Sequence, residues 1–263
     1  MRRPGWFNSA VAWMVYALLY APIAVVVVFS FNAARSGLEW QGGTLDWYRR
    51  LFEDDQVRSA LKVSMIVAVA STAMAAVLGT TLALALEKHF RRGRGLVDGL
   101  LAVPVFVPDI VLAAALLLFF GLMRAWVGVF ELGLTTIVAG HVTFQIPFVA
   151  LVVRARLAGM DPALDEAASD LGATPRQIFR HVTLPLLMPG IVAGAMLAFT
   201  LSLDDFVVSF FSGGPGSTTL PVYIYSSVKR GVTPEIHALS TLLMAVSVVA
   251  TVVAMMLQRR DVR

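Results

Sequence analysis

Six long runs of apolar residues, separated by polar segments, dominate the pattern along the chain. Each run is close to the ~20 residues that a helix needs to cross a bilayer. The alternation of apolar and polar residues that is typical of membrane β-barrel strands is not found. The pattern predicts an all-α polytopic membrane protein, a single transmembrane domain over residues 1–263, with six transmembrane helices at about 11–31, 63–86, 100–123, 132–153, 190–211 and 238–257.

The composition supports a membrane protein and excludes several other classes. Hydrophobic residues make up 58% of the chain and charged residues 14%, whereas soluble domains carry about 25% charged residues. Such a composition excludes disordered, collagen-like and coiled-coil proteins. Because the chain has no cysteine, disulfides, thiolate metal sites and cysteine nucleophiles are excluded too.

The basic residues predict the orientation in the membrane. Most of the 21 Lys and Arg residues lie in the N-terminal segment, in the 87–99 and 154–189 loops and in the C-terminal tail. Segments rich in Lys and Arg stay in the cytoplasm. We therefore expect both termini to be cytoplasmic, which requires an even number of spans. The net charge of +4 follows from these segments and does not indicate a nucleic-acid partner.

The cytoplasmic loop 154–189 has the pattern of two short helices joined at a glycine. Asp161 and Pro162 are suited to start the first helix, and Gly172 to end it. Thr174 and Pro175 then begin a second helix. The first helix has an acidic face and an apolar face, and the apolar face needs something to pack against. It packs either on its own bundle or in a groove of a peripheral protein. The apolar face consists of Leu164, Ala167, Ala168 and Leu171.

The same loop resembles a motif of a known family. Glu166-Ala167-Ala168, then Gly172, then Val182-Thr183-Leu184-Pro185 is similar to the EAA loop of binding-protein-dependent ABC importer permeases, although that family prefers Ile where Val182 stands. The resemblance implies a type I ABC importer permease (MetI-like) fold whose cytoplasmic coupling helix docks on an ATPase subunit. The residues implied in this coupling are Glu166, Ala167, Ala168, Asp170, Gly172, Leu184 and Pro185.

Further motifs resemble one branch of these permeases, the spermidine/putrescine importers and their PotC/PotI-type subunit. They include Pro108-Asp109-Ile110-Val111, the Phe199–Asp205 segment and Thr219-Leu220-Pro221. The resemblance implies a bacterial cytoplasmic (inner) membrane protein surrounded by lipid. Its partners would be a homologous permease (PotB- or PotH-like), two ATPase subunits (PotA- or PotG-like) and a periplasmic polyamine-binding protein (PotD- or PotF-like).

A transport subunit of this kind is not itself an enzyme. The sequence contains no Gly-x-x-x-x-Gly-Lys-Ser/Thr run, so this chain has no P-loop with which to hold ATP. We therefore expect that it binds no cofactor and no metal, and that ATP and Mg are used by the partner ATPase.

Three carboxylates within the predicted spans indicate a cationic substrate. Asp109, Asp204 and Asp205 lie there, without any Lys or Arg. A charge at the centre of a membrane costs about 2.5–3.5 kcal/mol on insertion scales, so each requires a reason. Counted along continuous helices, Asp109 lies about 15 Å into its span and Asp204 about 21 Å into its own. Staggered acceptors suit a cation in transit, but Asp109 is equally suited to capping a helix that restarts after Pro108.

Several other polar and aromatic residues belong to this hypothesis. Phe206, Tyr223 and Tyr225 are further candidates for the substrate pathway, because aromatic rings attract ammonium groups. His141 and Gln145 lie one turn apart on the fourth span. Their pattern favours hydrogen bonds between helices over a role as ligands.

Three alternatives to a polyamine importer remain at this stage. The first is an ABC importer permease for another small cationic solute. In the second, a secondary transporter, Asp109, Asp204 and His141 would relay protons, which leaves the Glu166 loop without a role. In the third, an intramembrane aspartyl protease, Asp109 and Asp204 would form the dyad. That chemistry needs carboxyls about 3 Å apart, whereas the estimated depths differ by about two helical turns.

Overall fold

The computed structural model describes residues 6–34, 39–88 and 94–261, and within these ranges every regular element is a helix, apart from an isolated bridge between Asn32 and Gly43. The prediction of an all-α protein is confirmed. Among the described residues, five helical runs are long and apolar enough to cross a membrane: α1 (Trp6–Phe29), α3 (Asp55–Lys88), α5 (Asp109–Val127), α6 (Leu134–Ala158) and the run that ends with α9 (Leu184–Asp204).

The sixth predicted span falls in α12 (Pro234–Asp261). Its apolar portion within the described residues is Pro234–Val249. With α12 included, the helices agree in number and order with the six spans that the apolar runs predict. Two compact units make up the chain, the first combining residues up to Arg58 with those from Ile224 onwards and the second covering Ser59–Tyr223. A single domain over the whole chain stays a prediction.

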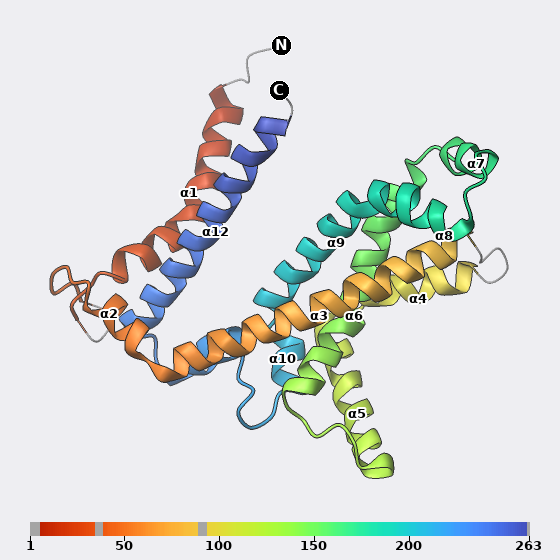
Figure 1. Cartoon of the computed structure of the whole chain (residues 1–263). Helices are drawn as coiled ribbons and strands as arrows, with labels where there is room; N and C mark the ends of the chain where they lie inside the picture. Colours follow the sequence, from red (N-terminus) through yellow and green to blue (C-terminus); the bar gives the residue numbers. More distant parts are fainter. Residues whose placement is uncertain (1–5, 35–38, 89–93, 262–263) are drawn as a thin grey trace. The chain divides into compact units, whose positions relative to one another are not determined.

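In the first unit, α1 packs along α12, and the short helix α2 (Asp46–Glu53) packs on α12 (Figure 1). The start of α1 and the end of α12 lie at the same end of this pair. Because α2 is amphipathic, it buries Trp47 and Leu51, which are one turn apart. On its outer face Arg49 pairs with Glu53 at 3.3 Å.

A buried asparagine organises the segment between α1 and α2. The Asn32 amide donates to the Glu39 carbonyl at 2.7 Å, and its Oδ1 accepts from the backbone of Gln41 at 3.0 Å. The Trp47 indole donates to the Asn32 carbonyl at 2.7 Å. The polar atoms of this side chain and its carbonyl are thereby paired, as burial requires.

In the second unit, α6 is the helix around which the others pack. It contacts α4 (Arg94–Phe106), α5, α9 and α10 (Val207–Ser212). Glycines allow two of the close approaches: a Cβ on Gly79 would lie 2.8 Å from Val149 Cβ, and one on Gly194 would lie 3.4 Å from the Val149 Cα. The buried core between these helices includes Leu86, Val149, Val153 and Leu187.

The structure corrects the predicted third span. Instead of one interrupted helix over 100–123, α4 ends at Phe106 and α5 begins at Asp109. Pro108 explains the break, because it lacks an N–H and disfavours helical geometry at the preceding residue. The prediction that the helix restarts after Pro108 is confirmed.

The helix that covers most of the predicted fifth span, 190–211, has other bounds than that span. The helix begins much earlier, because α8 (Pro175–Ile178) passes through a π-helical turn, η1 (Phe179–Thr183), directly into α9. It also ends earlier, at Asp204, and α10 starts only at Val207. The helix of the fourth span, α6, continues beyond the predicted span to Ala158. Much of the predicted 154–189 loop is therefore helical.

Candidate functional site

The 154–189 loop contains α7 (Ala163–Asp170), whose two ends have the chemistry expected from the sequence. At the start, Asp161 Oδ1 accepts from the Ala163 N–H at 3.0 Å. At the end, Gly172 adopts a φ of +81°, the left-handed conformation that favours glycine. The Gly172 and Ala173 N–H groups donate to the carbonyls of Ser169 and Ala168, which is a Schellman motif. The predicted helix stop is confirmed.

The second helix of the loop is joined to the membrane without an interruption. Gln177 Oε1 accepts from both the Thr174 N–H and the Thr174 hydroxyl at 2.8 Å, and Pro175 occupies the first helical position. From there α8, η1 and α9 form one continuous helical run from Pro175 to Asp204. α8 is therefore covalently and helically continuous with the long apolar helix α9.

The apolar face of α7 lies open. None of the residues of α7, all of which the structure describes, is buried. Leu164 is 45% exposed, and Leu171, just beyond the helix, is 89% exposed. Glu166, Ala167 and Asp170 are exposed as well, whereas Ala168 is half-buried. The sequence leaves two interpretations of this face, packing on its own bundle or in a groove of a peripheral protein. The described residues do not show packing on its own bundle.

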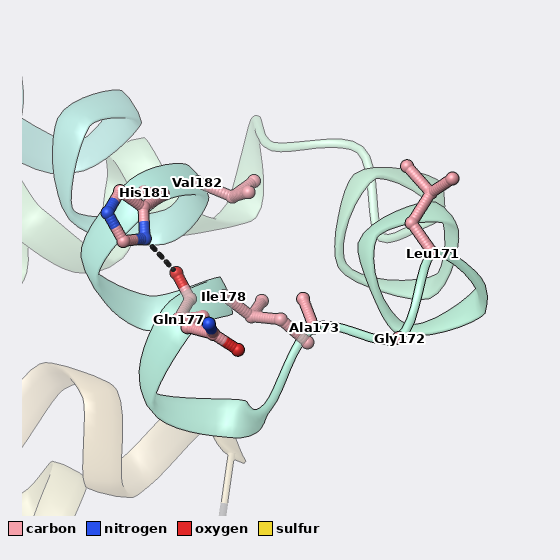
Figure 2. A pocket seen from close by; sticks show the side chains of 7 residues that line it. All are labelled: Leu171, Gly172, Ala173, Gln177, Ile178, His181 and Val182. Carbon is pink, nitrogen blue, oxygen red and sulfur yellow. Dashed lines mark hydrogen bonds between the residues drawn. The ribbon is translucent and has the colours of Figure 1, made fainter.

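A notch separates the end of α7 from the second helix (Figure 2). Its volume is about 350 Å³. Leu171 stands on one side of it, and Ile178 and Val182 lie on the other. The His181 ring bonds to the Gln177 carbonyl at 3.0 Å, within the second helix. The complete lining is Leu171, Gly172, Ala173, Gln177, Ile178, His181 and Val182.

Two arginines fix the helices beside this loop, a role that sequence reasoning missed. Arg154 bridges Glu87 at 3.1 Å and Asp98 at 2.6 Å, and so joins α6 to α3 and α4. Arg156 donates to the Leu186 carbonyl at 3.0 Å, and joins α6 to α9. In the sequence these residues are indistinguishable from the other basic residues of the loops, because their partners lie far away along the chain. Leu184 is half-buried and Pro185 exposed in the first turn of α9.

The predicted pathway carboxylates have three different surroundings. Asp109 is the first residue of α5 and is exposed, so the unbroken helix from residue 99 along which its depth is counted is not present in the structure. Its position in the first turn is favourable for a negative charge. Asp204 is the last residue of α9 and is also exposed. Asp205 is half-buried in the break between α9 and α10, beside Phe206.

The structure brings Asp205 together with His141 rather than with the other carboxylates. The His141 ring, fully buried in α6, has Nε2 at 3.2 Å from Asp205 Oδ2 and at 3.0 Å from Ser209 Oγ, and Nδ1 at 2.7 Å from Ser202 Oγ. Gln145 Nε2 donates to the Ala198 carbonyl at 3.0 Å. The predicted role of His141 and Gln145 in joining helices is confirmed.

The two tyrosines lie in α11 (Leu220–Arg230), at the boundary of the two units. Tyr223 is the last residue of the second unit and is half-buried. Tyr225 belongs to the first unit and is 40% exposed, with Lys229 Nζ 4.8 Å from the centre of its ring. Tyr225 thus already faces a cation of its own chain.

Comparisons with known proteins identify relatives over nearly the whole length. Residues 75–260 match the family described as "Binding-protein-dependent transport system inner membrane component". The chain is 43% identical to the spermidine/putrescine transport system permease protein PotC of Escherichia coli K12, over 93% of this chain and 91% of that protein. It is 41% identical to the putrescine transport system permease protein PotI of the same organism, over 94% and 89%.

Solved structures show the same fold. A chain of a bacterial ABC transporter involved in the import of the acidic polysaccharide alginate superposes with a TM-score of 0.73, at 21% identity, covering 97% of this chain and 98% of that chain. A second alginate transporter structure, in complex with a periplasmic protein bound to an alginate pentasaccharide, gives a TM-score of 0.70 at 21% identity and 95% coverage of both chains. At this identity the likeness shows the fold alone.

Proposed function

Because the chain belongs to the binding-protein-dependent transport system inner membrane components, we propose that it is the permease subunit of an ATP-driven importer of polyamines such as spermidine or putrescine. The observation that carries the substrate class is the identity of 41–43% over more than nine-tenths of the chain to PotC and PotI. The chain forms one half of the translocation pathway, and a homologous PotB- or PotH-like permease forms the other half.

The carboxylates agree with an importer of cations. Asp109 and Asp204 are exposed at helix ends that adjoin breaks in apolar helices. A carboxylate that faces lipid is costly, so these side chains are expected to face the pathway. There they replace part of the hydration shell of each ammonium group. Phe206, which flanks the break, adds a ring surface for the same groups.

The loop agrees with docking on a separate ATPase. The Leu164–Leu171 face is apolar, exposed and held on a rigid turn, and α8 continues directly into α9. This is the arrangement that a helix docking into a groove requires. The PotA- or PotG-like ATPases use ATP and Mg, and a periplasmic PotD- or PotF-like protein delivers the substrate. The loop and both termini are cytoplasmic in this assembly, in the bacterial inner membrane.

The secondary-transporter alternative lacks a relay. His141 contacts Asp205, Ser202 and Ser209, and its described contacts include neither Asp109 nor Asp204. The remaining alternative is an ABC importer for another small cationic solute.

Substrate-stimulated ATP hydrolysis tests the proposal. The complete complex in lipid nanodiscs, with its binding protein, is supplied with putrescine, spermidine, choline or glutamate in turn. We expect the two polyamines to stimulate hydrolysis and choline and glutamate not to. Stimulation by choline alone would favour another cationic solute, and stimulation by glutamate alone would contradict the cation assignment.

A further inference from the structure

The break between α9 and α10 lies within an apolar stretch and needs internal partners for its backbone. Asp205 has an extended conformation, with φ −66° and ψ 121°, and interrupts the helix. Where lipid replaces water, the N–H groups that a break frees must be bonded within the protein. Asp205 supplies such bonds: Oδ2 accepts from the Ser209 N–H at 2.8 Å and Oδ1 from the Val208 N–H at 3.3 Å.

One imidazole spans this break. His141 Nδ1 bonds Ser202 in the last turn of α9, while Nε2 contacts Ser209 and Asp205 on the α10 side. Both ring nitrogens are used, and the ring is completely buried. A single side chain of α6 is therefore bonded to both helices that meet at the break, and it restrains the angle between them.

The backbone of α6 also lies unusually close to α10 at this level. A Cβ on Gly140, the residue before His141, would lie 2.8 Å from Val208 Cγ1 and 3.3 Å from Ser212 Oγ. Only a glycine permits this approach, which brings the imidazole within reach of Ser209. By contrast, Gln145, one turn further along α6, bonds only to the Ala198 carbonyl of α9 among its described contacts.

The residues on either side of the break are the ones that the proposed function assigns to the substrate. Asp204 is exposed at the end of α9, and Phe206 lies next to Asp205 with its ring centre 5.3 Å from that of Phe210. The Asp205 carboxylate is instead engaged by His141 and by the first turn of α10. The two adjacent carboxylates therefore differ in their contacts. Asp205 is bonded within the break, whereas the side chain of Asp204 is exposed.

We propose that His141 is a positioning residue, which fixes the α9–α10 break through Ser202, Asp205 and Ser209 and thereby orients Asp204 and Phe206 toward the polyamine. This inference rests on the proposed function for its transport consequence. Its structural part, the restraint of the break by one imidazole, is independent of the substrate.

The test uses the absence of cysteine in the natural sequence. Spin labels are attached at Met196→Cys in α9 and Phe210→Cys in α10, two exposed positions on either side of the break. The distance distribution between the labels is measured by pulsed electron paramagnetic resonance in the complete nanodisc complex. The backgrounds compared are the unsubstituted chain, His141→Leu, His141→Gln, Ser209→Ala and the matched control Gln145→Leu.

We expect one narrow distribution in the unsubstituted chain and in Gln145→Leu, and a shifted or broadened distribution in His141→Leu. His141→Gln, which keeps a donor and an acceptor, should restore most of the narrow distribution, and Ser209→Ala should lie in between. Without the labels, His141→Leu should reduce polyamine uptake by about threefold or more, in line with the loss of interhelical hydrogen bonds, while basal ATP hydrolysis persists.

An unchanged distance distribution in His141→Leu would overturn the inference, and so would a changed distribution with normal uptake. Equal effects of Gln145→Leu and His141→Leu on the distance distribution would also overturn the inference, because the restraint of the break would then not be specific to His141. If the unsubstituted complex transports no polyamine, the proposed function fails, whereas the distance measurement still decides whether His141 holds the break. If His141→Leu does not assemble, the distance distributions of His141→Gln and Ser209→Ala provide the test instead.

Discussion

The Thr183 hydroxyl donates a 3.2 Å hydrogen bond to Asp165 Oδ1 and so joins the exposed helix α7 to the π-helical turn before α9. Thr183 is buried, and Asp165 is half-buried. Since α8, η1 and α9 form one run, this bond attaches α7 to the same helical run at a second point. Movement of a docked ATPase would then be passed to α9 through both the loop and the bond.

Thr183→Val should therefore weaken coupling while the complex still assembles. Valine keeps the shape and removes the hydrogen-bond donor. We expect polyamine uptake per ATP hydrolysed to fall severalfold, measured in proteoliposomes. Thr174→Val on the same loop is a control, because Thr174 bonds only within its own helix start among the described contacts. Equal losses in both variants would contradict the role of the Asp165–Thr183 bond.

Gly172→Val should impair coupling through backbone strain. No atom lies within 4 Å of a Cβ built at Gly172, so the side chain itself fits. The left-handed conformation, however, costs a residue other than glycine about 1–2 kcal/mol. We expect reduced uptake and reduced substrate-stimulated ATP hydrolysis, with normal membrane insertion. Gly172→Asn should be milder, since asparagine tolerates this conformation, and a Gly172→Asn defect as large as that of Gly172→Val would argue against strain.

Charge reversal on α7 should also prevent productive docking. Glu166 is exposed, in the first turn of the helix, where a negative charge is favourable. Glu166→Lys should lower binding of the ATPase subunit and uptake, with the chain still inserted. Co-purification of the ATPase measures this directly. Wild-type co-purification and uptake would show that this face is not the docking surface.

The pathway carboxylates should separate into two classes. Asp109→Asn and Asp204→Asn keep the shape and remove the charge, and each should reduce uptake at least tenfold while basal ATP hydrolysis is retained. Asp205→Ala should instead lower the amount of assembled complex, because it removes the acceptor of the Ser209 N–H and the partner of His141. Normal uptake by both asparagine variants would mean that these carboxylates are structural.

Single cysteines test the orientation predicted from the basic residues. Arg176→Cys lies at an exposed position of the 154–189 loop, and Thr218→Cys lies at an exposed position of the segment between α10 and α11. An impermeant thiol reagent should label Thr218→Cys in spheroplasts and Arg176→Cys only after the cells are opened. Ser217 is unsuitable, because it is buried and bonded to Gly214. The opposite labelling pattern would reverse the orientation.

The sequence predicts features that depend on neighbouring residues. The helix stop at Gly172 and the helix restart after Pro108 follow from local backbone chemistry, and long apolar runs specify the spans. The sequence does not predict how the fifth span is divided. Asp204 and Asp205 are adjacent acids of the same type. The structure distinguishes them because Asp205 caps the first turn of α10 and contacts His141, which lies 64 residues earlier than Asp205.

The same limit applies to the counted depth of Asp109, which assumes an unbroken helix, and to the two arginines. The estimate for Asp109 assumed a continuous helix through Pro104 and Pro108, but only Pro104 is accommodated inside a helix. Arg154 finds Glu87 and Asp98 only after α3, α4 and α6 have packed together. Contacts between distant segments, rather than composition or periodicity, decide each of these cases.

The most direct measurement of the central claim is uptake of radiolabelled spermidine and putrescine into proteoliposomes that contain the complete complex, with binding protein outside and ATP inside. Both membrane faces are held at the same pH and without a membrane potential. We predict accumulation of at least one polyamine that requires ATP and is abolished by Glu166→Lys. Accumulation without ATP when a proton gradient is imposed, or no accumulation of either polyamine, would contradict the assignment as the permease of a polyamine importer.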